Sequence, residues 1–228
     1  MEREVSALTR NWRRVRRPHD GRTYIFFESG DAVCACSGIG PEPARRAAEA
    51  IIALYHPAVL HSVGFAGALD STLKVGDIFT PEAIVDARDG SRIHLEQGSG
   101  TLLTFTHIAS AAQKSKLGEA YGAHAIDMEA AAVVAAASAH GIAFVATKAI
   151  SDEIEFELPG MEDFIDHNGQ FRTTAFVLHT AIRPWLWSRV AKLDRNSRKA
   201  ASALAKELDN LLADAERSVG TTTSGRHD

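Results

Sequence analysis

The chain has 228 residues with a formal net charge of −4, and 45% of its residues are hydrophobic. This composition favours a sizeable buried core, and the absence of a concentrated basic stripe argues against nucleic acid or an anionic membrane surface as the main partner. No apolar run approaches the roughly 20 residues of a membrane-spanning helix, and the N-terminus lacks a signal-peptide core, so we expect a cytoplasmic protein that acts on small molecules.

The first quarter of the chain predicts a hairpin followed by a helix. After the basic opening "NWRRVRRPHDGR", two β-rich runs at residues 23–27 and 32–37 are separated by a turn. The second run carries Cys34 and Cys36, which we expect to be buried, reduced thiols. The motif "SGIG" then leads through two prolines into an alanine-rich helix that ends at Tyr55, because prolines in a first turn lose no needed hydrogen bond.

The middle of the chain alternates strands and helices. A buried strand is predicted for "AVLHSVG", and it breaks at the loop "GFAGALD". One or two strands are predicted in "KVGDIFTPEAIVDA", and another in "TLLTFTH" before a helix from about Ser110 to Tyr121. A short strand, "AHAI", precedes Asp127, which we expect to cap a helix from Met128 to His140.

The next segment predicts the centre of the sheet. The run "IAFVATKAI" is nearly continuous in apolar residues, as is typical of a strand covered on both faces. Together these elements predict a three-layer α/β fold, with a central mixed, mostly parallel sheet flanked by helices. We expect this domain to span residues 1–183. An additional helical segment is expected at residues 184–218, and a disordered tail at residues 219–228.

Acidic residues follow two of the predicted strands. Ligands of open α/β sheets bind outside the carboxyl ends of the strands, where Glu129 follows "AHAI" and Asp152 follows "IAFVATKAI". Glu129 also lies in a first helical turn, where the helix dipole favours an ionised carboxylate that could accept two hydrogen bonds from the diol of a ribose. The alternative interpretation is that both acids only stabilise or cap helices.

The stretch "AIDMEAAAVVAAASAHGIAFVATKAISD" resembles the signature of the nucleoside phosphorylase and nucleosidase superfamily, the purine and uridine phosphorylase family. Further matches occur in "MEREVSAL", "SGIG" and "VGFAGALDSTLKVGDIF". The resemblance covers residues 1 to about 180, and is closest to the methylthioadenosine/S-adenosylhomocysteine nucleosidase branch and its hopanoid-pathway relatives. It implies a nucleoside substrate, no metal and no cofactor, and a homo-oligomer, with a dimer favoured.

The resemblance also implies roles for individual residues. Glu129 would bind the ribose hydroxyls while Met128 packs against the sugar. Asp152, protonated when substrate is bound, would donate a proton toward N7 of the leaving purine, and its acidic neighbours would favour that form. Glu4 would position the attacking water. The other residues expected to bind substrate are Ser151, Phe65, Ala66 and Gly67.

The sequence is compatible with three functions. We expect a nucleosidase that cleaves a purine nucleoside such as methylthioadenosine or S-adenosylhomocysteine. Phosphorylases place an arginine and a serine around the glycine-rich loop, where this chain has Ser62 and Phe65, which favours water over phosphate. The alternatives are a phosphate-dependent phosphorylase and a weakened member that binds nucleoside without turnover. Relatives also carry a strand before "MEREV", and that strand lies inside the sheet. We therefore expect either that the start of this chain was placed too late or that another segment fills the position of the strand.

Overall fold

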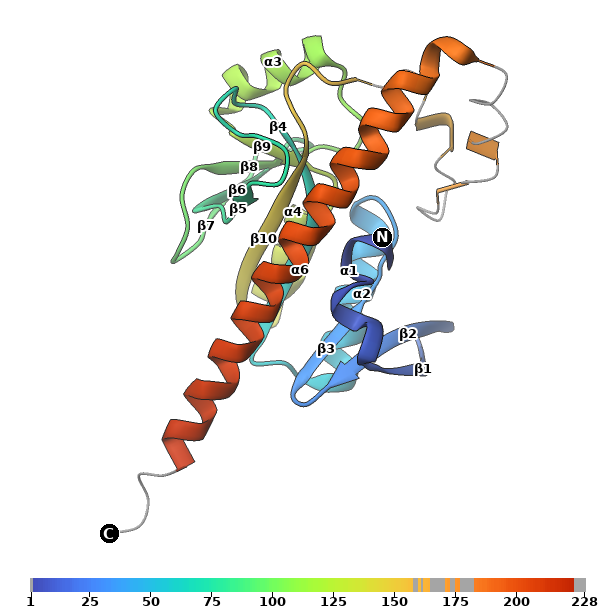
Figure 1. The fold of residues 1–228 in the computed structure, drawn as a ribbon. Coiled ribbons are helices and arrows are strands. Elements are labelled where there is room, and N and C mark those ends of the chain that lie inside the picture. The colour runs from blue at the N-terminus through green and yellow to red at the C-terminus, as the bar shows by residue number, and fades with distance from the viewer. Residues whose placement is uncertain are drawn as a thin grey trace.

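The computed structural model describes residues 2–157, 160, 162–164, 171–172, 175–176 and 183–223 (Figure 1). Its strands form two separate sheets, one of three strands and one of seven. The seven-stranded sheet has the order β5-β10-β4-β9-β8-β6-β7. Within the described residues, no helix is both long enough and apolar enough to cross a membrane.

The small sheet is antiparallel and contains the predicted hairpin. Its strands are β1 (Arg13–His19), β2 (Arg22–Ser29) and β3 (Ala32–Ala35). The hairpin of β2 and β3 is therefore confirmed, whereas β1 arises from the basic opening, where no strand was predicted. The reason is that β1 lies at the edge of the sheet with most of its side chains exposed, so it lacks the apolar alternation that marks a half-buried strand.

The large sheet is mixed and confirms the predicted α/β fold. β10 runs parallel to β4, and β8 runs parallel to both β6 and β9, whereas β4 and β9 are antiparallel. Its strands are β4 (Val59–Ala68), β5 (Ile78–Phe79), β6 (Ala83–Asp86), β7 (Arg92–His94), β8 (Thr101–Thr104), β9 (Ala125–Asp127) and β10 (Ala143–Asp152).

Helices cover both faces of the large sheet, which makes three layers. Neighbouring residues of a strand point to opposite faces, so Leu102 packs in the apolar cluster of α4 (Ala130–Ala139) and Leu103 packs in the cluster of α3 (Ala111–Tyr121). The helix α2 (Pro41–Tyr55) shares a second cluster with α4.

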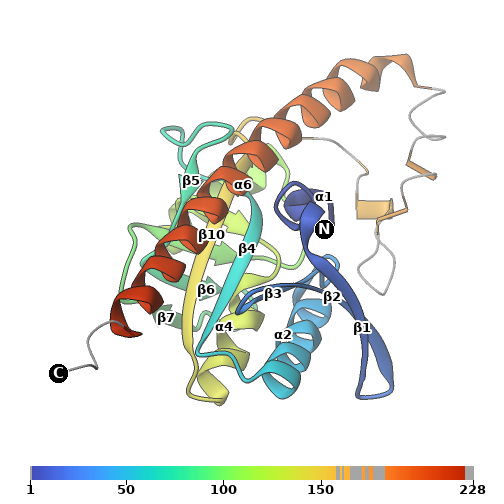
Figure 2. The ribbon, with the colours of Figure 1, turned by 60° about the horizontal axis from the view of Figure 1, so that its bottom comes forward.

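The long helix α6 (Trp187–Thr223) lies across β10 (Figures 1 and 2). It packs through Leu204 and Leu208 against Ala149 of β10 and Val5 of α1 (Glu2–Val5). The segment expected at residues 184–218 begins with a short 3-10 turn at Pro184–Leu186. The helix forms the rest of it and continues to Thr223, within the expected tail. Residues 224–228 lie outside the described residues.

Two sequence-based boundaries were wrong. β4 continues to Ala68 through the predicted loop, because Gly67 and Ala68 pair with β9 while the preceding residues pair with β10. The helix predicted from Met128 begins at Ala130 instead, and Asp127 ends β9. The carboxylate of Asp127 nevertheless caps this helix, since it accepts the Ala130 N–H at 2.9 Å.

A cavity separates β3 from β4. The edge of β4 that faces away from β10 pairs with β9 only at its last two residues, and β3 pairs with β2 alone. Among the residues that the structure describes, no strand lies between these two edges. Residues 34–35 of β3 and residues 60–65 of β4 line a cavity of about 120 Å³ there.

Candidate active site

Polar and apolar side chains both line the cavity between the sheets. Its polar lining includes Glu4, Ser62, Glu129 and Lys148. Its apolar lining comes mainly from α2, β4 and α4, and includes Ala44, Ala47, Ile51, Leu60 and Val133. A volume of about 120 Å³ lies below the roughly 300–1,000 Å³ of ordinary ligand pockets. The cavity as it stands therefore has room for part of a nucleoside, and the rest must lie outside it.

Glu129 is held in the cavity wall by two backbone N–H groups. Its Oε1 accepts the Gly40 N–H at 2.7 Å, and its Oε2 accepts the Met128 N–H at 3.2 Å. Gly40 is the last residue of the "SGIG" motif and has φ +99°, a conformation that favours glycine. The motif therefore provides the backbone conformation from which the Gly40 N–H reaches Glu129.

Burial changes the charge expected for Glu129. Burial and the neighbouring Asp127 carboxylate raise the pKa of Glu129 to about 7, against the opposing effects of Lys148 and the Gly40 N–H. The sequence indicated that the helix N-terminus favours the ionised form of Glu129, but burial opposes that form here. At neutral pH the group is close to the midpoint of its titration, because loss of hydration outweighs the helix N-terminus.

Lys148 is the buried cation of the site, and sequence reasoning missed it. Its Nζ lies 2.9 Å from Asp127 Oδ2 and donates to Ser62 Oγ at 3.1 Å. Although burial acts to lower it, the pKa of Lys148 is raised by the carboxylates of Asp127 and Glu129. The signal was present in "IAFVATKAI", because a lysine inside an otherwise apolar central strand is rarely buried unless it is paired.

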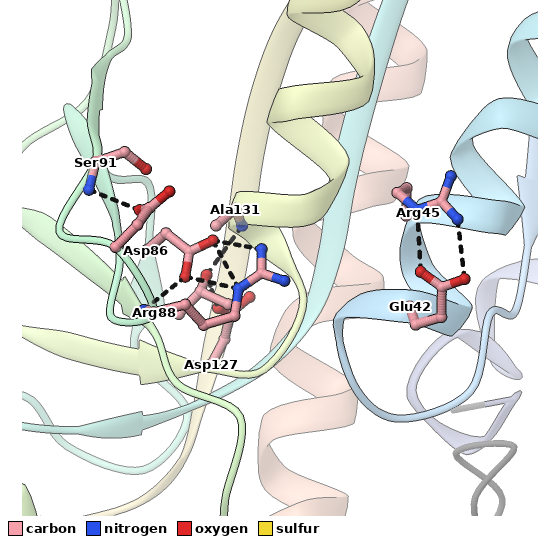
Figure 3. A network of polar contacts seen from close by, with 9 residues as sticks. Glu42, Arg45, Asp86, Arg88, Ser91, Asp127 and Ala131 are labelled. Atoms are coloured by element: carbon pink, nitrogen blue, oxygen red, sulfur yellow. Dashed lines mark hydrogen bonds and ion pairs between the residues drawn. The ribbon is translucent and has the colours of Figure 1, made fainter.

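Asp127 connects this lysine to the start of α4. Thr104 Oγ1 donates to Asp127 Oδ1 at 2.7 Å and accepts the Ala131 N–H at 2.9 Å. Asp86 follows at the same edge of the sheet, in register with Thr104, and its carboxylate accepts from the Arg88 side chain (Figure 3). Because each buried polar side-chain atom of this network has a partner, the network fixes the end of β9 and the orientation of α4.

Glu4 lies close to Lys148 although it comes from the first helix. A Cβ added at Gly64 would lie 3.1 Å from Glu4 Oε2 and 4.0 Å from Lys148 Nζ. Both charged groups therefore approach β4 at Gly64, where there is no side chain. The neighbouring Val5 is 4% exposed and packs under α6, which holds α1 against the sheet. Glu4 is thus part of a packed structure and not of a frayed terminus.

Asp152 has a cation for a partner. Ser151 Oγ donates to Asp152 Oδ1 at 2.6 Å, and Lys114 Nζ from α3 forms an ion pair with Asp152 Oδ2. The group in contact with this carboxyl is therefore a lysine, where we expected acidic neighbours.

The structure brings some of the predicted residues together and leaves others apart. Glu4, Phe65 and Glu129 line the cavity. The predicted residues that do not line it are Ala66, Gly67, Met128, Ser151 and Asp152. Asp152 packs on Gly67 instead, where an added Cβ would lie 2.8 Å from its Oδ2. Gly67 pairs with Asp152 of β10 on one side and with β9 on the other. Asp152 is therefore two strand spacings, or about 10 Å, from β9, the strand that precedes Glu129.

The sequence of the chain matches the Phosphorylase superfamily over residues 1–102 and 87–182. These residues make up most of the chain. The protein belongs to the Phosphorylase superfamily. Among curated proteins, none is similar enough in sequence to count as a match.

Solved structures share the fold of this Phosphorylase superfamily member. Futalosine hydrolase of Helicobacter pylori has a TM-score of 0.68 at 16% identity, over 94% of each chain. The 5′-methylthioadenosine/S-adenosylhomocysteine nucleosidase of Neisseria meningitidis has a TM-score of 0.65 at 19% identity, over 91% of this chain and 93% of that chain. The Campylobacter jejuni nucleosidase of the same description has a TM-score of 0.64 at 18% identity, over 92% and 96%.

Proposed function

We propose that the protein is a nucleosidase that hydrolyses the N-glycosidic bond of a purine nucleoside. The observation that carries the proposal is the convergence of Glu4, Glu129 and Lys148 on one cavity. Two carboxylates near a sugar stabilise the positive charge that develops on it as the bond to the base breaks. Family membership and the shared fold support the same class of reaction.

Glu129 is the proposed ribose ligand. In its ionised form the carboxylate can accept hydrogen bonds from two vicinal hydroxyls. The N–H groups of Gly40 and Met128 hold the carboxylate in one orientation, so little conformational entropy is lost when the sugar binds.

Glu4 and Lys148 are the proposed holders of the attacking water. Water adds through its oxygen to C1′ of the sugar, and its proton passes to the Glu4 carboxylate. The electron pair of the bond between C1′ and the base leaves with the base, which takes a proton from Asp152. The two acids then exchange protons with solvent, so the net reaction consumes one water and yields free base and free sugar.

Water is favoured over phosphate by the charges around the cavity. A phosphate needs several cationic or N–H donors, whereas Glu4 and Glu129 would repel it. The positive charge of Lys148 is already balanced by Asp127. His61 also lines the cavity, but burial and the charge of Lys148 lower its pKa to about 4, so it is neutral at pH 7.

Methylthioadenosine and S-adenosylhomocysteine are the proposed first candidates as substrates. Both carry an apolar thioether at the 5′ position, and apolar side chains such as Ile39 and Phe65 line the cavity beside its charged groups. Such side chains favour the methylthio group of methylthioadenosine, whereas the charged homocysteine end of S-adenosylhomocysteine would have to lie outside the cavity, because burying an unpaired charge is costly.

One assay tests the reaction and its alternatives. The protein is incubated with adenosine, inosine, methylthioadenosine and S-adenosylhomocysteine, with and without phosphate, and free base is measured by chromatography. Base release without phosphate supports the nucleosidase, and release that requires phosphate would identify a phosphorylase. Binding in calorimetry without any release would identify a nucleoside-binding protein. Glu4→Gln should lose at least about 100-fold in kcat, whereas Glu119→Gln on the exposed face of α3 should keep the activity.

A further inference from the structure

The buried side chain of α3 is a lysine. The helix has a well-defined start, because Ser110 and Gln113 form a capping box. Of its eleven residues Lys114 alone is classed as buried, with 3% of its surface exposed, while Lys116 two positions later is exposed. An ammonium removed from water needs compensating partners, since the loss of hydration is worth several kcal/mol. The hydrogen-bond acceptors around Lys114 therefore make its burial possible.

Three acceptors surround the Lys114 ammonium, one for each of its N–H groups. One is Asp152 Oδ2, and the others are the backbone oxygens of Glu153 at 3.0 Å and Phe156 at 3.1 Å. All three acceptors belong to the end of β10 and the segment directly after it. Lys114 therefore ties α3 to both the side chain of Asp152 and the backbone beyond it.

We propose that Lys114 is a positioning residue for Asp152 in base release, an inference that rests on the proposed hydrolysis. Ser151 and Lys114 each hold one carboxyl oxygen of Asp152, so the group has one orientation at the strand end. When the proton of Asp152 passes to N7 of the leaving base, a negative charge is left on Asp152. The ammonium of Lys114 stabilises that charge as it forms, because it is already in contact with the carboxyl group.

The test compares two leaving groups. A purine leaves with a proton from Asp152, whereas 4-nitrophenol leaves a riboside as a stable phenolate and needs no acid. Lys114→Met should lower kcat about 100-fold on the purine nucleoside with little change in KM, and should change kcat on 4-nitrophenyl riboside by less than about threefold. Asp152→Asn should show the same selectivity, and the double variant should be no slower on the purine nucleoside than Asp152→Asn alone. Lys116→Met on the same helix is the control.

Several results would overturn the proposal. One is an equal loss on both substrates, which is what a purely structural role predicts. Another is a double variant whose loss is the product of the two single losses, which would make the two residues independent. Lys114→Gln, which keeps a hydrogen-bond donor, serves the same comparison if the methionine variant does not fold.

The proposed function and this inference fail in different ways. If the unaltered protein releases no base from any nucleoside, the proposed hydrolysis is wrong. The interaction between Lys114 and Asp152 is then measured from the unfolding equilibria of Lys114→Met, Asp152→Asn and the double variant. An unfolding constant for the double variant at least tenfold below the product expected from the singles supports the coupling of Lys114 to Asp152, and a simple product would overturn it.

Discussion

Lys148 Nζ on β10 lies 2.9 Å from Asp127 Oδ2 on β9, although β4 lies between these two strands in the sheet. The side chains are 2% and 0% exposed, so the ion pair is fully removed from water. Lys148 is in register with Gly64 of β4, and the missing side chain there leaves room for the lysine to cross. This buried pair stands beside Glu129 and sets the charge balance of the candidate site.

Replacing Lys148 by Met should destabilise the fold strongly. Removing one partner of a buried ion pair leaves an uncompensated charge, here on Asp127, at a cost of about 3–5 kcal/mol. The free energy of unfolding from urea denaturation measures the loss. Lys116→Met, an exposed change of the same kind, should stay within about 0.5 kcal/mol of the parent protein. A small effect at Lys148 would mean that the pair is not formed.

The contribution of Glu129 to stability should fall as pH rises from about 4.5 to 7. Its folded pKa of about 7 lies above the ordinary value of 4.5, so in this range the folded state binds more protons than the unfolded state. Ionisation of the buried group therefore costs stability as pH increases. Glu129→Gln removes this contribution, so between pH 4.5 and 7 its unfolding free energy should rise more with pH than that of the parent protein. Equal slopes for the two proteins would contradict the assignment.

The same titration should control substrate affinity in the proposed reaction. An ionised Glu129 accepts hydrogen bonds from both ribose hydroxyls, whereas the protonated form accepts them less well. We expect kcat/KM to rise with pH up to about 7, the value to which burial raises the pKa of Glu129, and then to level off. In Glu129→Gln the rise of kcat/KM with pH should disappear, and KM should increase. A 2′-deoxynucleoside is the matched control, since it lacks one of the hydroxyls.

His61 should make the protein sensitive to acid. Burial and the charge of Lys148 lower its pKa to about 4 in the folded state, while the unfolded value is 6.5. This contribution to stability is present above pH 6.5 and is lost as pH falls toward 4, because the unfolded state then binds the extra proton. His61→Gln should reduce the loss by on the order of 2 kcal/mol, as measured by unfolding at pH 7 and pH 4.5. An unchanged acid sensitivity would count against a buried, neutral His61.

The helix α6 should contribute to the stability of the whole domain. Leu204 is fully buried against β10 and α1, so Leu204→Ala should cost about 2–5 kcal/mol. Leu211 on the same helix is 38% exposed, and Leu211→Ala should cost much less. Thermal unfolding of the two variants gives the comparison. Equal and small effects would indicate that α6 is an appendage to the domain.

Local sequence patterns predicted most of the large sheet and its helices. The strands β4 and β10, and the helix after Ser110, follow from the pattern of apolar residues along the chain. The order of motifs likewise identified Glu4, Glu129 and Asp152 as candidates. The edge strand β1 escaped prediction because exposed arginines carry no periodic signal.

The sequence by itself determined the fold class and the types of charged group at the strand ends, because these depend on neighbouring residues in the chain. Only the tertiary structure decided how those groups are paired. Lys148 meets Asp127 across a strand, and Lys114 meets Asp152 from a helix 38 residues away. Charge interactions and loss of hydration depend on distances in space, and at Glu129 they raise the pKa to about 7.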